Sequence, residues 1–219
     1  MKNILFLGNS FTYFNDLPQL IQLIIDPQKK EYDLVSVTKG GATLLEFATP
    51  SERRERFIFK LERKKWDGLV LQDNGINPAV NLKETIEATR ILTKDANCQT
   101  YFYQTWAYQE GSAKLASTNM KYEEFYQLLK DGYHAAAKEC NGIVVPAGDG
   151  FRYLHHHYPD INLYRDDCYH PNILGSSLTA LIFAKVLADI DIMNAWLPEE
   201  IDDKTKERLK EAAIAVTNC

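Results

Sequence analysis

The sequence predicts an α/β fold, a three-layer α/β/α sandwich in which helices cover both faces of a central, mostly five-stranded parallel sheet. Three observations lead to this prediction. Short β-rich segments alternate with longer helical patterns, as in a doubly wound sheet with right-handed crossovers. Several β-rich segments are almost continuously apolar, which is typical of strands buried on both faces. The chain has 219 residues and is 45% hydrophobic, enough for one domain with a sizeable core.

Five segments carry the strand signal, a short apolar and β-branched stretch that is followed by turn-forming or polar residues. The first, "NILFLG", stops at Gly-Asn-Ser, where a small residue and two polar residues precede an aromatic one. In chain order the expected strands are 3–8, 33–38, 68–72, 99–104 and 142–146. Each is short enough to be a strand and is separated from the next by a longer segment.

Six segments have apolar residues at three- and four-residue intervals, which indicates helices. In chain order they are 17–25, 50–65, 81–96, 119–140, 172–190 and 198–216. No internal repeat, low-complexity tract or linker interrupts this layout. We therefore expect a single domain over 1–219, with a core at about 2–187 and a charged helical tail over 198–216.

Composition argues against several classes of protein. The net charge is -5, and no basic stripe is interleaved with aromatic residues, so we expect no nucleic-acid partner. No apolar segment approaches the ~18 residues of a membrane-spanning helix. The first apolar segment lacks a following small-residue cleavage site, so we interpret it as a strand and expect a cytoplasmic protein. A secreted or periplasmic location stays open if a leader has been removed.

Cysteine and histidine spacing gives no sign of a metal site. Cys98, Cys140, Cys168 and Cys219 are widely separated and form no Cys-x-x-Cys pair, so free thiols are expected. Three adjacent histidines occupy 155–157, but adjacent side chains diverge and lack the spacing that lets two imidazoles share one ion. We expect no metal and no organic cofactor.

The functional crevice of a doubly wound sheet lies beyond the carboxyl ends of its strands. Candidate site residues are therefore those that directly follow the predicted strands. They are Gly8, Asn9, Ser10, Gly40, Gly41, Gln72, Asp73, Asn74, Thr105 and Trp106, together with a segment after the fifth strand.

Ser10 is a candidate nucleophile, but a serine hydroxyl is weak without a base. His170 is the best candidate base, because Asp167 precedes it by three positions. In a turn, Asp167 can reach the nearer imidazole nitrogen and leave the farther one free to take the proton of Ser10. The structural alternative is that Ser10 caps a helix and that 167–172 is a polar capping loop.

Taken together, Gly8-Asn9-Ser10 and the Asp-Cys-Tyr-His segment at 167–170 resemble the outer two sequence blocks of the SGNH (GDSL-type) hydrolases. The string "ILFLGNSFT" is similar to a branch in which Asn replaces the Asp of Gly-Asp-Ser. The resemblance covers about 2–187 and implies a flavodoxin-like hydrolase fold. It also implies a Ser10 nucleophile, a His170 base that then acts as an acid, and an orienting Asp167.

The resemblance further implies an oxyanion hole made by the backbone N–H of Ser10, a glycine N–H and an amide side chain. Gly41 fits the glycine best, and Gly40 replaces it if the register differs by one. The family usually has Gly-x-Asn-Asp at the third block, whereas this chain has "LQDN". Asn74 fits the amide by position, and Gln72, at the strand end, fits it by chemistry; we slightly favour Gln72.

Two other residues are expected near the substrate. Asn9 can hydrogen-bond within the nucleophile turn without bringing a charge. Trp106 either forms a wall of the acyl or sugar site or packs inside the fold.

The resemblance implies a serine esterase that acts on short O-acyl esters, especially acetylated carbohydrates. Two long segments rich in polar and aromatic residues, 107–120 and 148–165, would suit a sugar-binding rim. The absence of a long apolar lid argues against a long-chain lipase. Alternatives are an O-acyltransferase with the same triad, a non-catalytic carbohydrate-binding protein and a flavodoxin-like nucleotide binder, which "GNSFTYF" matches poorly.

Overall fold

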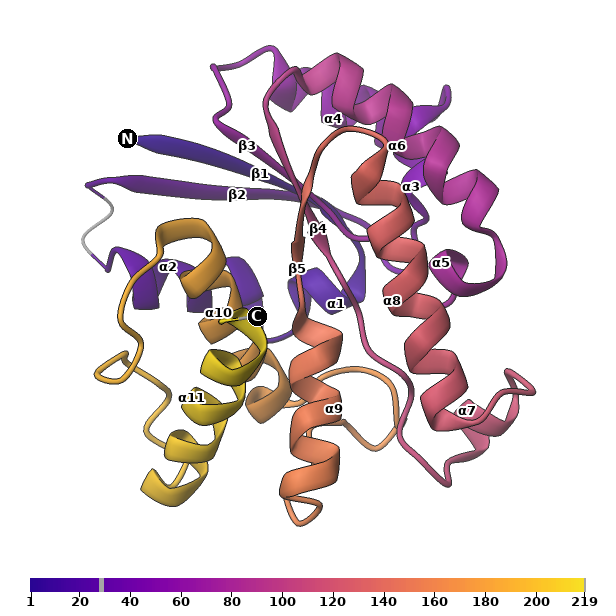
Figure 1. The fold of residues 1–219 in the computed structure, drawn as a ribbon. Coiled ribbons are helices and arrows are strands. Elements are labelled where there is room, and N and C mark those ends of the chain that lie inside the picture. The colour runs from indigo at the N-terminus through magenta and orange to yellow at the C-terminus, as the bar shows by residue number, and fades with distance from the viewer. Residues whose placement is uncertain (28–29, 219) are drawn as a thin grey trace.

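A computed structural model describes residues 1–27 and 30–218 of the chain. Its centre is a five-stranded sheet in the order β2-β1-β3-β4-β5, and all neighbouring strands are parallel (Figure 1). The strands are β1 (Lys2–Gly8), β2 (Tyr32–Thr38), β3 (Gly68–Leu71), β4 (Gln99–Tyr103) and β5 (Ile143–Val145). The predicted three-layer α/β/α fold is confirmed, and every strand ends within one residue of its expected position.

The alternation of side chains along the strands builds two separate cores. In β1, Phe6 faces one core, whereas Leu5 and Leu7 face the other, and all three are fully buried. The same alternation recurs in β4, where Phe102 and Tyr103 belong to different cores. Both faces of the sheet are therefore covered, which explains the nearly continuous apolar strands.

Helices divide between the two faces of the sheet. The longer ones are α2 (Leu17–Ile25), α4 (Glu52–Leu61), α6 (Leu82–Ala96), α8 (Tyr122–Lys138), α9 (Ala147–His157), α10 (Ile173–Ala188) and α11 (Asp203–Thr217). The shorter ones are α1 (Ser10–Tyr13), η1 (Phe14–Asp16), α3 (Leu44–Ala48), α5 (Asn77–Val80) and α7 (Ala113–Ala116). Buried residues of α2, α9, α10 and α11 join the core of Phe6, and those of α3, α4 and α6 join the other core. Helix α8 contributes to both cores.

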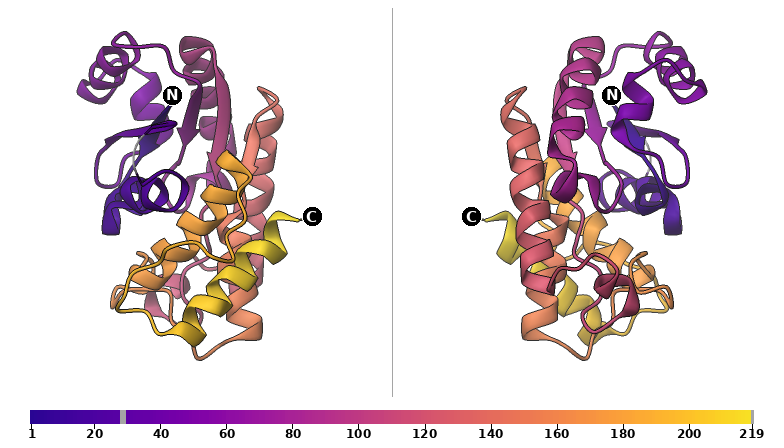
Figure 2. Two further views of the ribbon diagram at one scale, coloured as in Figure 1. Left: turned by 90° about the vertical axis from the view of Figure 1, so that its left-hand side faces the viewer. Right: turned by 90° about the vertical axis from the view of Figure 1, so that its right-hand side faces the viewer.

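Helix α10 lies in the middle of its layer. It contacts α2, α9 and α11 (Figure 2), and most of its residues are buried. The C-terminal helix α11 buries Leu209, Ala212 and Ala213 against this layer. The segment expected to be a charged tail therefore ends in a helix that shares a core with the sheet.

Helix α9 was missing from the sequence-based prediction, which treated 148–165 as part of a polar rim. Gly148 and Gly150 lower the helix propensity of its first turn. Both glycines are needed for close packing, because a Cβ on Gly148 would lie 2.3 Å from the Thr105 carbonyl oxygen and one on Gly150 would lie 2.6 Å from the Ile182 side chain. Tertiary packing therefore outweighs the local preference.

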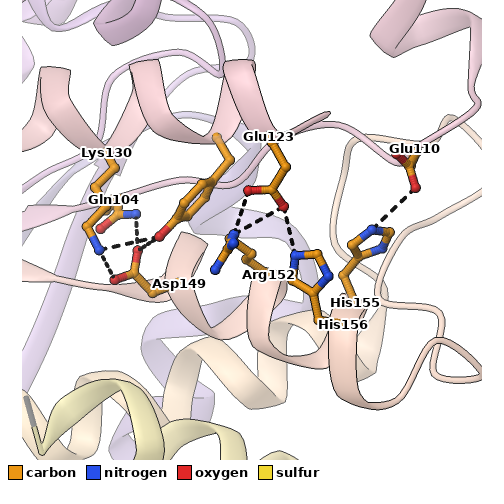
Figure 3. A network of polar contacts seen from close by, with 9 residues as sticks. Gln104, Glu110, Glu123, Lys130, Asp149, Arg152, His155 and His156 are labelled. Atoms are coloured by element: carbon orange, nitrogen blue, oxygen red, sulfur yellow. Dashed lines mark hydrogen bonds and ion pairs between the residues drawn. The ribbon is translucent and has the colours of Figure 1, made fainter. Parts of the chain in front are cut away.

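The three adjacent histidines lie in the last turn of α9, and two of them, His155 and His156, point to different partners (Figure 3). His155 Nε2 is 3.4 Å from a carboxylate oxygen of Glu110, and His156 Nε2 is 2.7 Å from one of Glu123. Within 1–27 and 30–218, no group of three or more His, Cys, Asp or Glu side chains is arranged to hold a metal ion. His155 and His156 instead connect α9 to neighbouring segments, and His157 Nδ1 lies 2.9 Å from the Tyr153 carbonyl within the same helix.

Two further features follow from the described residues. None of their helices is long and apolar enough to cross a bilayer. Cys98, Cys140 and Cys168 are free thiols, whereas Cys219 lies outside the described residues.

Candidate active site

Ser10 lies at the carboxyl edge of the sheet, two residues beyond the end of β1. It is the first residue of α1, and the side chain of Asn9 caps that helix by accepting a 3.2 Å hydrogen bond from the N–H of Phe11. Because Asn9 is the cap, the Ser10 hydroxyl is left free for another partner. The Ser10 N–H belongs to the first turn, where backbone N–H groups have no partner within the helix.

The Gly-Asn-Ser sequence is explained by a buried polar cluster beneath Ser10. A Cβ on Gly8 would lie 2.5 Å from both Gln72 Oε1 and Thr12 Oγ1, so only glycine fits there. Gln72 Oε1 accepts hydrogen bonds from the Asn9 N–H and the Thr12 hydroxyl, each 2.9 Å long. Asn9 Nδ2 donates to the carbonyl of Ala42, 3.0 Å away. Asn9 thus joins the nucleophile turn to the segments after β2 and β3 without a buried charge.

The structure brings Ser10, His170 and Asp167 into one hydrogen-bonded chain. His170 Nε2 lies 2.7 Å from Ser10 Oγ, and His170 Nδ1 lies 2.7 Å from Asp167 Oδ2. The other carboxylate oxygen of Asp167 accepts hydrogen bonds from the backbone N–H groups of His170 and Tyr169, at 2.9 and 3.2 Å. This geometry is that of a Ser-His-Asp triad, in which each group lies within hydrogen-bond distance of the next.

Asp167 is held in its ionised form. Partial burial by itself raises the pKa of this carboxyl, but the backbone and ring hydrogen bonds from His170 outweigh it, so the pKa lies below its usual range. An ionised Asp167 accepts a hydrogen bond from the Nδ1–H of His170. Nε2 is then the unprotonated nitrogen that faces Ser10.

Hydrogen bonds within the loop and from Trp106 hold the loop that carries His170. An isolated bridge pairs Tyr164 with Pro171, and the His170 carbonyl accepts a 2.9 Å hydrogen bond from the N–H of Arg165. Trp106 Nε1 donates to the carbonyl of Tyr169 across 3.0 Å. Because these hydrogen bonds fix the backbone on both sides of His170, the loop holds the imidazole in place.

Trp106 is not a wall of the substrate site. It is fully buried and its ring stacks on Phe151, with centroids 3.8 Å apart and planes 5° apart. The packing alternative is therefore the correct one. The tryptophan follows β4 as predicted, but its large apolar ring is more stable in the core than at the crevice.

Aromatic rings enclose the imidazole of His170, whose side chain is only 12% exposed. The rings of Phe14 and Phe11 lie edge-on to it, at centroid distances of 4.6 and 5.5 Å, and the ring of Tyr169 lies 3.9 Å away. These contacts restrict water and fix the ring orientation. Sequence reasoning missed all three, although Phe11 and Tyr169 directly adjoin triad residues.

Ser10 and His170 open into a pocket of about 350 Å³. It is also lined by both glycines of the segment after β2 and by several aromatic side chains. The full lining is Asn9, Ser10, Phe11, Tyr13, Phe14, Gly40, Gly41, Asn74, Gly75, Ile76, Tyr108, Tyr169 and His170. The pocket is therefore mixed in character, with polar groups around Ser10 and apolar rings around them.

Gly41 and Asn74 lie at this pocket as the sequence suggested. Gly41 has φ of +69° in a turn closed by the Ala42 N–H and the Lys39 carbonyl, a conformation that favours glycine. Asn74 Oδ1 accepts hydrogen bonds from the N–H groups of Ile76 and Asn77, at 3.1 and 2.9 Å. Its Nδ2 has no hydrogen-bond partner among the described residues and is free to donate to a substrate oxygen.

Gln72 does not have the position expected of an oxyanion donor. It is completely buried and does not line the pocket. Its Nε2 donates to Asn9 Oδ1 at 3.0 Å and to the carbonyl of Asp73, so both amide protons are used. The slight preference for Gln72 over Asn74 was therefore wrong. Gln72 hydrogen-bonds to the turn that carries Ser10, whereas Asn74 faces the pocket.

Asn74→Ala is expected to lower kcat for ester hydrolysis on the order of 10²–10³-fold, because one donor to the developing oxyanion is lost. Gln72→Ala is instead expected to destabilise the fold by about 1–3 kcal/mol, because buried partners on Asn9 and Thr12 lose their acceptor. Steady-state kinetics and thermal unfolding of both variants test this division. Unchanged kcat in Asn74→Ala would contradict it.

Asp73 is a buried carboxyl that follows β3, as the sequence predicted, although the prediction gave it no role of its own. It lies between Gln72 and Asn74, and its Oδ1 accepts hydrogen bonds from the N–H groups of Leu44 and Asn74, at 3.0 and 2.8 Å. Its Oδ2 accepts a 2.6 Å hydrogen bond from the hydroxyl of Thr85. Burial raises its pKa to about 6, although these hydrogen bonds oppose the rise. Asp73 thus links the backbone of Asn74 to the first residue of α3.

Asp73→Asn is expected to change the pH dependence of stability. The folded protein holds the Asp73 proton more tightly than the unfolded chain, so its contribution to stability is complete below about pH 4 and is lost as pH rises through about 6. As pH rises between these limits, the free energy of unfolding of the variant should increase relative to that of the wild type by on the order of 1–3 kcal/mol. Urea unfolding of both proteins at several pH values checks this, and a difference that does not vary with pH would contradict it.

Comparisons with known proteins concern the chain as a whole. No protein-family model matches the chain, and no curated protein is significantly similar to it. Among solved structures, it is 26% identical to a protein described as "a putative SGNH hydrolase" from Slackia heliotrinireducens, with a TM-score of 0.76 over 85% of this chain and 99% of that one.

Two more distant structures share the fold. A DUF4886 family protein from Bacteroides uniformis ATCC 8492 is 18% identical, with a TM-score of 0.77 over 99% of this chain and 93% of that one. The acetyl xylan esterase AlAXEase is 16% identical, with a TM-score of 0.64 over 84% of this chain and 99% of that one.

Proposed function

We propose that this member of the SGNH superfamily, a carboxylic ester hydrolase, removes short acyl groups, acetyl above all, from carbohydrate esters through an acyl-enzyme. The observation that carries the proposal is the hydrogen-bonded chain from Asp167 through His170 to Ser10, which ends in an open pocket. Both links are 2.7 Å long: the link from Ser10 Oγ to His170 Nε2 is short enough for proton transfer, and the link from His170 Nδ1 to Asp167 orients the imidazole.

In the first step, Ser10 Oγ attacks the carbonyl carbon of the ester while His170 Nε2 takes its proton. The carbonyl oxygen becomes an oxyanion, which the N–H groups of Ser10 and Gly41 and the Nδ2 of Asn74 would receive. Asp167 stabilises the imidazolium that forms. When the tetrahedral intermediate collapses, His170 returns the proton to the leaving sugar oxygen, and the acyl group stays on Ser10.

In the second step, a water molecule gives a proton to His170 and attacks the acyl carbon. The second intermediate collapses to the free carboxylic acid, and Ser10 recovers its proton from His170. The chain needs only its own side chains and water for this cycle. Acyl transfer would differ only in that a sugar hydroxyl replaces the water.

The pocket supports a short acyl group and a carbohydrate alcohol. Its volume of about 350 Å³ lies near the lower end of the range of small-molecule sites. The rings of Tyr13, Tyr108 and Tyr169 line it, and aromatic faces beside polar groups suit sugar rings. One of the similar structures is an acetyl xylan esterase, which is consistent with this substrate class.

Hydrolysis of 4-nitrophenyl acetate, butyrate and octanoate tests the proposal. We expect kcat/KM to fall as the acyl chain lengthens. In a second assay, we expect acetate to be released from acetylated xylo-oligosaccharides. Added acceptor sugars would reveal transfer as an acetylated acceptor. A preference for octanoate, or no cleavage of any ester, would contradict the proposal.

A further inference from the structure

Two cationic side chains lie against the aromatic walls of the pocket. Lys114 Nζ lies 4.5 Å from the ring centroid of Tyr169 and 5.4 Å from that of Tyr108. Arg165 Cζ lies 4.8 Å from the ring centroid of Phe14. All three rings line the pocket, and those of Tyr169 and Phe14 contact the imidazole of His170. Each cation is therefore separated from His170 by one ring.

Neither cation is neutralised by a protein carboxylate. Within the described part of the chain, Lys114 and Arg165 have no ion pair within 4.0 Å, whereas Lys130 pairs with Asp149 and Arg152 with Glu123 (Figure 3). No acidic side chain is among the described residues that line the pocket. Many other lysines and arginines of the described residues also lack an ion pair, so what distinguishes these two is their contact with rings that line the pocket.

The nearby acidic groups do not supply the missing partner. The Asp167 carboxylate already binds the ring and the backbone N–H of His170. Asp166 follows Arg165 directly, but among the described residues the two side chains form no ion pair within 4.0 Å. The ring faces attract the cations without cancelling their charge, because a ring contributes only a quadrupole.

The two cations come from different elements. Lys114 lies on α7, in the segment after β4, and Arg165 lies on the loop that carries His170. They lie against different rings of the pocket wall, and neither lines the pocket itself, so they can contact only a part of a ligand that extends beyond these rings. An ammonium and a guanidinium both donate strong hydrogen bonds to carboxylates.

We propose that Lys114 and Arg165 select acyl esters whose sugar carries a carboxylate. The inference rests on the proposed function and specifies its substrate as an acylated acidic sugar, such as an O-acetylated uronic acid. The acyl group occupies the space beside Ser10, the sugar ring lies against the tyrosines, and its carboxylate reaches the two cations.

The kinetic test compares O-acetylated galacturonate and O-acetylated xylo-oligosaccharides as acidic and neutral substrates. We expect kcat/KM to be at least about tenfold higher for the acidic substrate. Lys114→Gln with Arg165→Gln should remove most of this preference while changing the neutral substrate and 4-nitrophenyl acetate less than about twofold. The preference should also weaken as NaCl is raised, because salt screens exposed charges.

A matched control removes an exposed cation elsewhere. Lys138 lies at the C-terminal end of α8 and precedes β5, at the amino edge of the sheet opposite the pocket. Lys138→Gln removes one positive charge, as either single substitution does, and should leave the preference unchanged. An equal loss for all substrates in the double variant would mean that the cations only support the loop, and it would overturn the proposal.

A binding measurement separates this inference from the proposed function. The Ser10→Ala variant is titrated calorimetrically with deacetylated galacturonate and xylose oligosaccharides, so that binding is measured without catalysis. Tighter binding of the acidic oligosaccharide that is lost on Lys114→Gln and Arg165→Gln supports the inference whatever the esterase assays give. Equal affinity for both oligosaccharides overturns it even if the protein is an active esterase.

Discussion

Ser10→Ala should abolish ester hydrolysis, with kcat for 4-nitrophenyl acetate falling by at least about 10⁴-fold. The variant loses the attacking oxygen, which lies 2.7 Å from His170 Nε2. The fold should be retained because the capping side chain of α1 belongs to Asn9 and not to Ser10. Steady-state kinetics and circular dichroism of the purified variant give both readouts.

A surface serine gives the control for this experiment. Ser117 follows α7, is exposed and hydrogen-bonds only locally, to the carbonyl of Lys114. Ser117→Ala should keep full activity and stability. If Ser10→Ala were folded and retained wild-type activity, Ser10 would not be the nucleophile.

Asp167→Asn should lower kcat by about 10⁴-fold with little change in stability. Asn can still accept hydrogen bonds from the backbone N–H groups of Tyr169 and His170 through Oδ1. Its Nδ2, however, replaces the oxygen that faces His170 Nδ1. The imidazole must then turn Nδ1 into an acceptor and carry its proton on Nε2, where it cannot accept the proton of Ser10. Kinetics across pH 5–9 and thermal unfolding measure the two effects.

The neighbouring carboxylate provides the comparison. Asp166→Asn removes the same charge one residue earlier, at an exposed position. It should change kcat by less than about threefold, because surface charges interact weakly with a site in water. Similar losses in the two variants would mean that charge near the loop matters and that the tautomer of His170 does not.

The sequence was enough to predict the sheet and to bring three distant residues together. Strands buried on both faces have a strong apolar signal, and the carboxyl ends of parallel strands must share one edge. Ser10 and His170 could therefore be expected to meet although nothing local joins them. Pairing Asp167 with His170 required only their three-residue spacing and a turn.

The remaining features depend on packing that a sequence does not contain. Gln72 and Asn74 have the same amide chemistry, and only the direction of each side chain decides that one is buried and the other faces the pocket. Trp106 follows a strand just as Ser10 does, yet its ring packs inward against Phe151. The glycines of α9 weaken the helical signal although the packed helix requires them.

Ser10 and His170 are 160 residues apart in the chain. Contacts of such long range form late in folding, because the intervening chain must first lose its freedom. Helix α10 directly follows the His170 loop and docks on α2, and Asn15 Nδ2 bridges the two regions through the Ser176 hydroxyl, 2.8 Å away. A nascent chain that has not yet released α10 from the ribosome thus has its sheet strands but no catalytic site. Regain of esterase activity during refolding will report the docking of the C-terminal half, later than any signal from secondary structure.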